Sequence, residues 1–258
     1  MARTPTVGLF IPCYVDQLAP EVGLATTALL DELGISFVVP RDPTCCGQPF
    51  LSAGALPQAQ RLAAAFAKAF DRFDHVVMPS GSCAATLRTH LAELVDDPDA
   101  AALAGRTYEL CQYLVEVVGA AGLTGRLDAR LGMHASCHAL RGIRLGHASE
   151  LRSPPTQDPA RVLLEGLAGV QWVELSRRDE CCGFGGVFCV DQPEVSGAMA
   201  RDRVEDHQRA GAQIVTSTDV SCLAHMRRIA AKTGSALRFL HVAQLLADRD
   251  RAPGQGGP

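Results

Sequence analysis

Short apolar runs alternate with helix-period patterns along the first half of the chain. Residues 6–12, 35–39 and 75–78 are short and mostly apolar, and 35–39 is rich in β-branched side chains, which predicts buried strands. Residues 20–33 and 57–73 carry apolar side chains three or four positions apart, which predicts helices, and further helices are predicted near 86–94 and 107–118. This alternation is typical of a parallel sheet covered by helices.

The same pattern starts again after a linking stretch at residues 123–131. Strands are predicted at 132–136, 170–175 and 213–217, and a helix at 193–210 with Asp191 as its cap. The repeat predicts an α/β protein of two tandem Rossmann-like lobes, each a small parallel sheet flanked by helices, related by a pseudo-twofold axis. We assign residues 1–121 to the first domain and 122–248 to the second, and expect a disordered tail at 249–258.

Eight of the ten cysteines follow the repeat, in the order Cys, Cys-Cys-Gly, Cys, just past predicted strands. The carboxyl ends of parallel strands lie at one edge of a sheet, so each set should converge there. The first set is Cys13, Cys45, Cys46 and Cys83, and the second is Cys137, Cys181, Cys182 and Cys222.

Glycines follow both cysteine pairs, as Gly47 in the first repeat and as Gly183, Gly185 and Gly186 in the second. Neighbouring side chains on a strand point to opposite faces, so two adjacent sulfurs reach one target only across a sharp turn, which glycine permits. The glycine N–H groups would also be free to approach the sulfides of a bound cluster.

Composition limits the classes of function. The chain has 258 residues, 47% hydrophobic and 20% charged, with a formal net charge of −4, so neither nucleic acid nor an anionic membrane is an expected partner. We see no signal peptide and no apolar run of transmembrane length, which predicts a cytoplasmic protein. In a reducing compartment, many cysteines indicate metal, cluster or redox chemistry rather than disulfides.

Four thiolates are the usual ligands of a 4Fe–4S cluster, so the sequence predicts one or two iron–sulfur clusters per chain. Structural zinc is a serious rival, and disulfide chemistry within each pair is a weaker one, because it leaves the other cysteines unexplained. Cys111 is interpreted as a packing residue, and Cys189, which follows the glycine loop, either as a packing residue, the favoured interpretation, or as an accessory or redox-sensitive one. His138 is either a ligand or proton donor near a cluster, or a histidine bonded to backbone.

Six segments of the chain resemble the lactate utilisation protein A family, a group of cysteine-rich "CCG" domain proteins related to the CCG-domain subunit of heterodisulfide reductase and to the glycolate oxidase iron–sulfur subunit. The resemblance covers nearly the whole chain. It rests on Ile11-Pro12-Cys13-Tyr14-Val15-Asp16, Pro20-Glu21-Val22-Gly23, Thr44-Cys45-Cys46-Gly47-Gln48-Pro49, Pro79-Ser80-Gly81-Ser82-Cys83, Cys181-Cys182-Gly183-Phe184-Gly185-Gly186 and Ser217-Thr218-Asp219-Val220-Ser221-Cys222.

The resemblance implies two CCG domains, iron–sulfur binding, and action with two partner proteins in the oxidation of L-lactate to pyruvate in the cytoplasm. The chain departs from the heterodisulfide reductase protein, which ends each domain with Cys-x-x-Cys and holds a noncubane cluster with five cysteines. Ser80 and Asp219 stand where the first cysteine of that pair would be. This departure speaks against five-thiolate clusters and leaves four-cysteine sites open.

Three hypotheses of function follow. The first is an iron–sulfur electron-transfer subunit of an NAD-independent lactate-oxidising complex. The second is a zinc-stapled scaffold that assembles partner enzymes, and the third is a thiol–disulfide reductase. No Ser-His-Asp array, flavin fingerprint or paired carboxylate site stands out in the sequence, so the chain is expected to be a redox or non-catalytic subunit.

Overall fold

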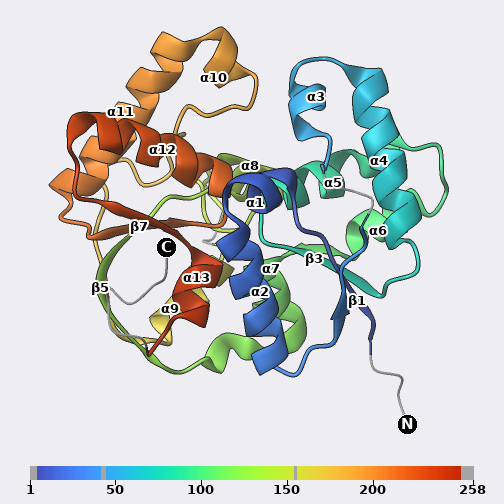
Figure 1. The fold of residues 1–258 in the computed structure, drawn as a ribbon, viewed down its shortest axis with the longest axis horizontal. Coiled ribbons are helices and arrows are strands. Elements are labelled where there is room, and N and C mark those ends of the chain that lie inside the picture. Colours follow the sequence, from blue (N-terminus) through green and yellow to red (C-terminus); the bar gives the residue numbers. More distant parts are fainter. Residues whose placement is uncertain (1–4, 42–44, 154–155, 251–258) are drawn as a thin grey trace.

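The computed structural model describes residues 5–41, 45–153 and 156–250, and it contains two four-stranded parallel sheets. The first has the order β2-β1-β3-β4 and the second β6-β5-β7-β8. Each strand of the first sheet therefore has its counterpart in the second (Figure 1). We call the parts of the chain that carry the two sheets the first and the second lobe. The predicted α/β fold with two tandem lobes is confirmed.

The first lobe contains four short strands and the helices that cover them. The strands are β1 (Val7–Leu9), β2 (Phe37–Val38), β3 (His75–Met78) and β4 (Thr107–Glu109). The α-helices are α1 (Cys13–Leu18), α2 (Pro20–Glu32), α3 (Gln48–Ser52), α4 (Leu56–Phe70), α5 (Gly81–Leu94), α6 (Ala100–Gly105) and α7 (Leu110–Gln112), followed by a π-helix, η1 (Tyr113–Val118), and a 3-10 helix, η2 (Ala120–Gly122).

The second lobe repeats this arrangement. Its strands are β5 (Arg126–Met133), β6 (Ala168–Trp172), β7 (Ile214–Ser217) and β8 (Arg238–His241). Its helices are α8 (Cys137–Gly142), α9 (Pro159–Glu165), α10 (Phe188–Asp191), α11 (Pro193–Arg209), α12 (Val220–Thr233) and α13 (Val242–Ala247). None of the helices in the described ranges is both long and apolar enough to span a bilayer.

The structure corrects several predicted elements. Residues 107–118 are not one helix, because they begin with β4. Residues 123–131 are not only a linker, because β5 begins at Arg126. The helix at 193–209 has Gln192 as its N-cap, while Asp191 is the last residue of α10. The predicted domain division after residue 121 falls between the two sheets and stays a prediction.

The predicted tail begins with two residues that are held in place. Arg249 donates a hydrogen bond to the Thr124 carbonyl at 3.0 Å, and the backbone N–H of Asp250 donates to the Arg126 carbonyl at 2.9 Å. Residues 251–258 lie outside the described residues.

The two lobes share one hydrophobic core. Helix α2 of the first lobe packs against α13 of the second, and α7 packs against α9. Fully buried leucines from these helices meet in a single cluster, which contains Leu29, Leu30, Leu110, Leu163, Leu164 and Leu246. Because this apolar surface is removed from water only when the lobes are together, its burial favours the joined arrangement.

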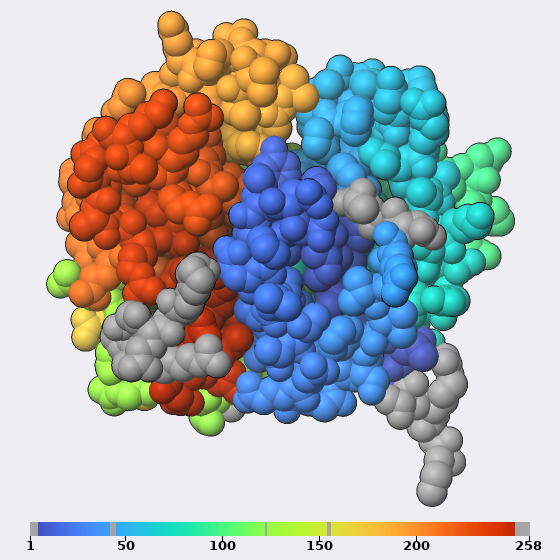
Figure 2. All heavy atoms as spheres, viewed as in Figure 1, coloured from blue at the N-terminus to red at the C-terminus, as the bar shows by residue number. Residues whose placement is uncertain are grey.

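A second contact between the lobes lies closer to the cysteines. Helix α5 packs against α8, and α1 packs against α12, so each contact is the counterpart of the other. A Cβ atom at Gly81 would lie 2.6 Å from the Cβ of Ala139, so this close approach of α5 and α8 requires glycine. The elements that follow both cysteine pairs, α3 and α10, stand at the same edge of the molecule, on either side of the boundary between the lobes (Figures 1 and 2).

Candidate metal centres

Both cysteine sets lie at the same place in their sheets. In the order β2-β1-β3-β4, the chain forms β2 on one side of β1 and then crosses to the other side of β1 to form β3. The carboxyl ends of β1 and β3 are therefore a topological switch point. Cys13 begins the helix after β1, and Cys83 is the third residue of the helix after β3. Cys137 and Cys222 have the same positions on α8 and α12. Four of the eight cysteines thus lie in the first turns of helices.

The cysteine pairs occupy loops that fold back over these helix ends. The thiols of the first set form a hydrogen-bonded chain in the order Cys13, Cys45, Cys46, Cys83, with 3.1 Å between the sulfurs of Cys46 and Cys83. The second set forms the same chain in the order Cys137, Cys181, Cys182, Cys222. All eight cysteines are free, and in each lobe the structure brings the four predicted residues together.

The predicted glycines shape both turns. Gly47 and Gly183 have φ of 86° and 80°, values that favour glycine. Their N–H groups donate to the sulfurs of Cys45 and Cys181 at 3.4 and 3.3 Å. Gly185 and Gly186 also have positive φ and line the cavity described below.

The second thiol of each chain, Cys45 or Cys181, has a lowered pKa. Hydrogen bonds from Cys13 and Cys46 lower the pKa of Cys45, and the Gly47 N–H lowers it further. Cys181 has a lowered pKa for the same reason, since it receives hydrogen bonds from Cys137, Cys182 and the Gly183 N–H. The thiolate is the form that binds metal. Each lobe therefore provides a thiolate flanked by further sulfur donors, which fits a metal ion or an iron–sulfur cluster.

A single cavity of about 80 Å³ joins the two sites. Seven of the eight predicted cysteines line it, and α3 contributes Gln48, Pro49 and Ser52. Tyr14 of the first lobe and Phe184 of the second pack edge to face beside it, with ring centroids 5.4 Å apart. Thiols of both lobes therefore line one shared cavity.

Asp219 fastens the lobes together beside this cavity. Its carboxylate accepts hydrogen bonds from the hydroxyls of Ser80 and Ser82 at 2.7 and 2.8 Å, and from the Ser82 N–H at 2.9 Å. It is only 1% exposed. A carboxylate at the N-terminus of α5 is also favoured by the helix dipole. Ser80 and Asp219, which stand where the heterodisulfide reductase protein has a further cysteine in each domain, are thus hydrogen-bonded to each other.

The remaining candidate residues have separate surroundings. His138 lies beside Cys137, with 3.6 Å between Nδ1 and Sγ, and a hydrogen bond of 3.0 Å joins its Nε2 to the side-chain amide of Gln48 in the first lobe. Cys189 donates to the Gly186 carbonyl at 3.0 Å. Cys111 is fully buried in the shared core, as expected of a packing residue.

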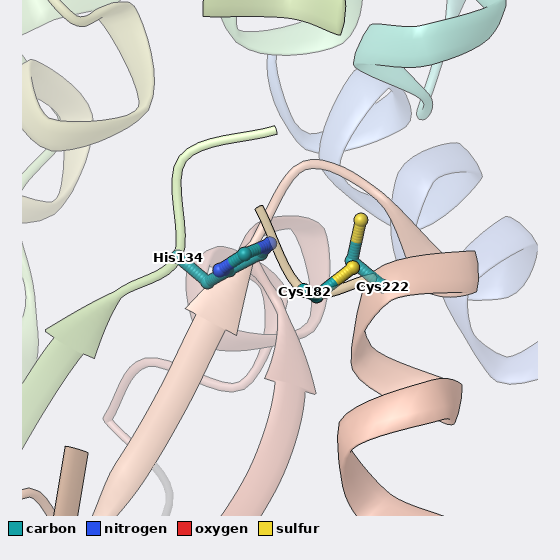
Figure 3. Close-up of side chains that lie close together, drawn as sticks. All are labelled: His134, Cys182 and Cys222. Carbon is teal, nitrogen blue, oxygen red and sulfur yellow. The ribbon is translucent and has the colours of Figure 1, made fainter. Parts of the chain in front are cut away.

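His134, which directly follows β5, lies beside the second thiol set and was not singled out by the sequence reasoning. Its ring and the sulfurs of Cys182 and Cys222 offer three ligand atoms within 4.8 Å of one another (Figure 3). Burial lowers the pKa of His134 to about 3, and the nearby Arg203 lowers it as well, so the ring is neutral. A neutral imidazole is the form that binds metal.

Comparison with known proteins identifies the family. A family model described as "Cysteine-rich domain" (CCG) matches residues 7–88 and 131–227, one match in each lobe. The chain is 34% identical to "Lactate utilization protein A" of Exiguobacterium sp. over 94% of its length and 97% of that protein, and 35% identical to the protein of the same name from Geobacillus kaustophilus over 95% and 99%.

A solved structure supports the fold alone. A crystal structure of a hypothetical protein from Helicobacter pylori superposes with a TM-score of 0.65 at 12% identity, covering 98% of this chain and 50% of that one. The duplicated cysteine sets, the paired sheets and the near full-length relatives agree: this chain belongs to the lactate utilisation protein A family and carries its cysteine-rich domain twice.

Proposed function

We propose that the protein is the iron–sulfur electron-transfer subunit of a cytoplasmic complex that oxidises L-lactate to pyruvate. The observation that carries the proposal is the meeting of four thiols at the switch point of each sheet, with both sets facing one cavity. The names of the relatives support a role in lactate utilisation.

Each thiol set would hold one cluster, and the cluster would supply one-electron transfer. The chain's own residues bind and tune it. Gly47 and Gly183 direct N–H groups at sulfur, a kind of hydrogen bond that affects reduction potential. Tyr14 and Phe184 line the cavity and pack edge to face next to the sulfurs.

The oxidation of lactate itself is assigned to partner proteins. Removing hydrogen from a hydroxy acid requires a base and an acceptor such as a flavin or nicotinamide. We infer two partner proteins from the family resemblance, with this chain receiving or passing on their electrons.

Anaerobic purification tests the metal assignment. The wild-type protein should be brown and contain about four irons and four acid-labile sulfides per occupied site. Cys46→Ser and Cys182→Ser should each remove the cluster of one lobe, whereas Cys189→Ser, the matched control outside both thiol sets, should leave the iron content unchanged. An iron-free protein with zinc and no sulfide would overturn the proposal in favour of the zinc scaffold.

The lactate assignment has its own test. In a complex purified with its partners, adding L-lactate anaerobically should bleach the visible absorption of the clusters. The isolated chain should show no change with lactate. A cluster that is reducible by dithionite but not by lactate in the complete complex would retain the iron–sulfur assignment and refute the lactate one.

A further inference from the structure

The two sites have different residues beneath them, although the fold repeats. Phe10 lies three residues before Cys13, and His134 lies three residues before Cys137. The N–H of Phe10 donates to the Val77 carbonyl at 2.9 Å, and that of His134 donates to the Thr216 carbonyl at 2.8 Å. Val77 and Thr216 occupy matching positions on β3 and β7. Phe10 and His134 are therefore structural equivalents.

The helices behind these two residues also differ in kind. In the first lobe, Phe10 packs edge to face on Phe66 and Phe70 of α4, with centroids 5.4 and 5.8 Å apart. In the second lobe, α11 presents Arg203 and His207, both fully buried. The first thiol set thus lies over an aromatic cluster, and the second lies over a polar one.

Glycine contacts show that the positions correspond. A Cβ atom at Gly8 of β1 would meet the ring of Phe70, and one at Gly132 of β5 would meet the ring of His207. Phe70 and His207 therefore fill the same place behind the central strand of their sheets. At these buried positions the first lobe has Phe10 and Phe70, and the second lobe has the polar residues His134 and His207.

The ring of His134 faces the thiols of Cys182 and Cys222 (Figure 3). His134 is 1% exposed, and its Nδ1 has no hydrogen-bond partner among the described residues. A buried polar side chain with an unpaired atom costs about 1–3 kcal/mol, so its presence calls for an explanation. Phenylalanine fills the equivalent space in the first lobe without that cost.

We propose that His134 is a nitrogen ligand of the metal centre in the second lobe, while the centre in the first lobe is bound by thiolates alone. Where a single tetrahedral metal ion binds both sulfur and nitrogen, bonds of about 2.3 and 2.0–2.1 Å place these ligand atoms about 3.5–3.8 Å apart. The three ligand atoms lie within 4.8 Å of one another, which is up to about 1 Å wider than that spacing. Imidazole and thiolate together bind both zinc and iron–sulfur centres.

This inference rests on the proposed function only in requiring that a metal is bound. Two full-length variants separate the lobes. Cys46→Ser with Cys83→Ser leaves only the second site, and Cys182→Ser with Cys222→Ser leaves only the first. His134→Phe is then introduced into both, which gives the second lobe the residue of the first.

X-ray absorption at the edge of the bound metal, iron or zinc, reads the ligands directly. The second-site protein should show a nitrogen shell at about 2.0–2.1 Å in addition to sulfur, and His134→Phe should abolish it or release the metal. The first-site protein should show no nitrogen shell, with or without His134→Phe. If the centre is a paramagnetic cluster, pulsed EPR on protein labelled with ¹⁵N-histidine should show coupling in the second-site protein alone.

His207→Phe is the matched control. It also removes a buried imidazole from the polar group beneath the second site, and it introduces the phenylalanine that the first lobe has at the equivalent position. It should retain the metal and the nitrogen shell. A sulfur-only shell in the second-site protein, or a nitrogen shell that survives His134→Phe, would overturn the inference and leave the proposed function intact. Absence of metal from both single-site proteins and from the wild type would refute both.

Discussion

Asp219 provides the sharpest test of how the lobes are held together. Its carboxylate is 1% exposed and accepts hydrogen bonds from three donors of the other lobe at 2.7, 2.8 and 2.9 Å. Hydrogen bonds to a charged group contribute about 1.5–3 kcal/mol each, but neighbouring contributions are not additive. Because Asp219→Ala leaves these donors buried without an acceptor, we expect it to lower the free energy of unfolding by about 3–5 kcal/mol.

A double-mutant cycle with Ser80→Ala isolates one contact. Urea unfolding of the wild type, both single variants and the double variant should give a coupling energy of about 1.5–3 kcal/mol between Ser80 and Asp219. All four proteins must be compared at equal metal content, because a metal that binds only the folded chain adds stability of its own. Asp202→Ala, on the exposed side of α11, should change stability by less than about 0.5 kcal/mol. A coupling energy below about 0.5 kcal/mol would show that the contact does not fasten the lobes.

Two further predictions concern stability. Burial raises the pKa of Glu109 from 4.5 to about 8, with smaller contributions from the charges of Asp219 and Asp158. Between these pH values the folded chain keeps the proton that the unfolded chain has released, so the stability of the wild type falls as pH rises. The stability of Glu109→Gln relative to the wild type should therefore rise by about 1.4 kcal/mol per pH unit. Equal pH dependence of the two proteins in urea titrations at about pH 5–7.5 would contradict this. Gly183→Ala should lower the free energy of unfolding by about 1–3 kcal/mol more than Gly186→Ala does. A Cβ atom at Gly183 would lie 2.7 Å from the Cβ of Met199, whereas the space around Gly186 is open. Equal thermal midpoints for the two variants would refute this explanation.

The strands could be predicted where both faces are buried. Residues 75–78 form β3 as predicted, because the three residues after His75 in this central parallel strand are apolar and buried. The strand β4 was missed, since Thr107, Tyr108 and Glu109 at the edge of the sheet merge with the helical pattern that follows. The first half of β5 was missed for a related reason: it pairs with β6 alone before β7 begins at Ile214, so it carries exposed polar side chains.

The cysteine sets could be predicted because their repeat is visible in the sequence itself. The contact of Asp219 with Ser80 could not, because the two residues are 139 positions apart and no local pattern connects them. His134 could have been found by comparing the repeats, since it stands where the first repeat has Phe10. Each repeat was searched for its own cysteine pattern, and a difference between the two repeats at a position without cysteine was therefore not noticed.

The pairing of Ser80 with Asp219 has a consequence for how such a molecule could arise. Each occupies the same position in its own half, so here a residue touches its own counterpart. In a symmetric homodimer of a single ancestral unit, that position would meet an identical copy, and two buried carboxylates at this distance would repel each other. Joining the copies in one polypeptide removes the requirement of identity, so that one copy can present the acid and the other the hydroxyl.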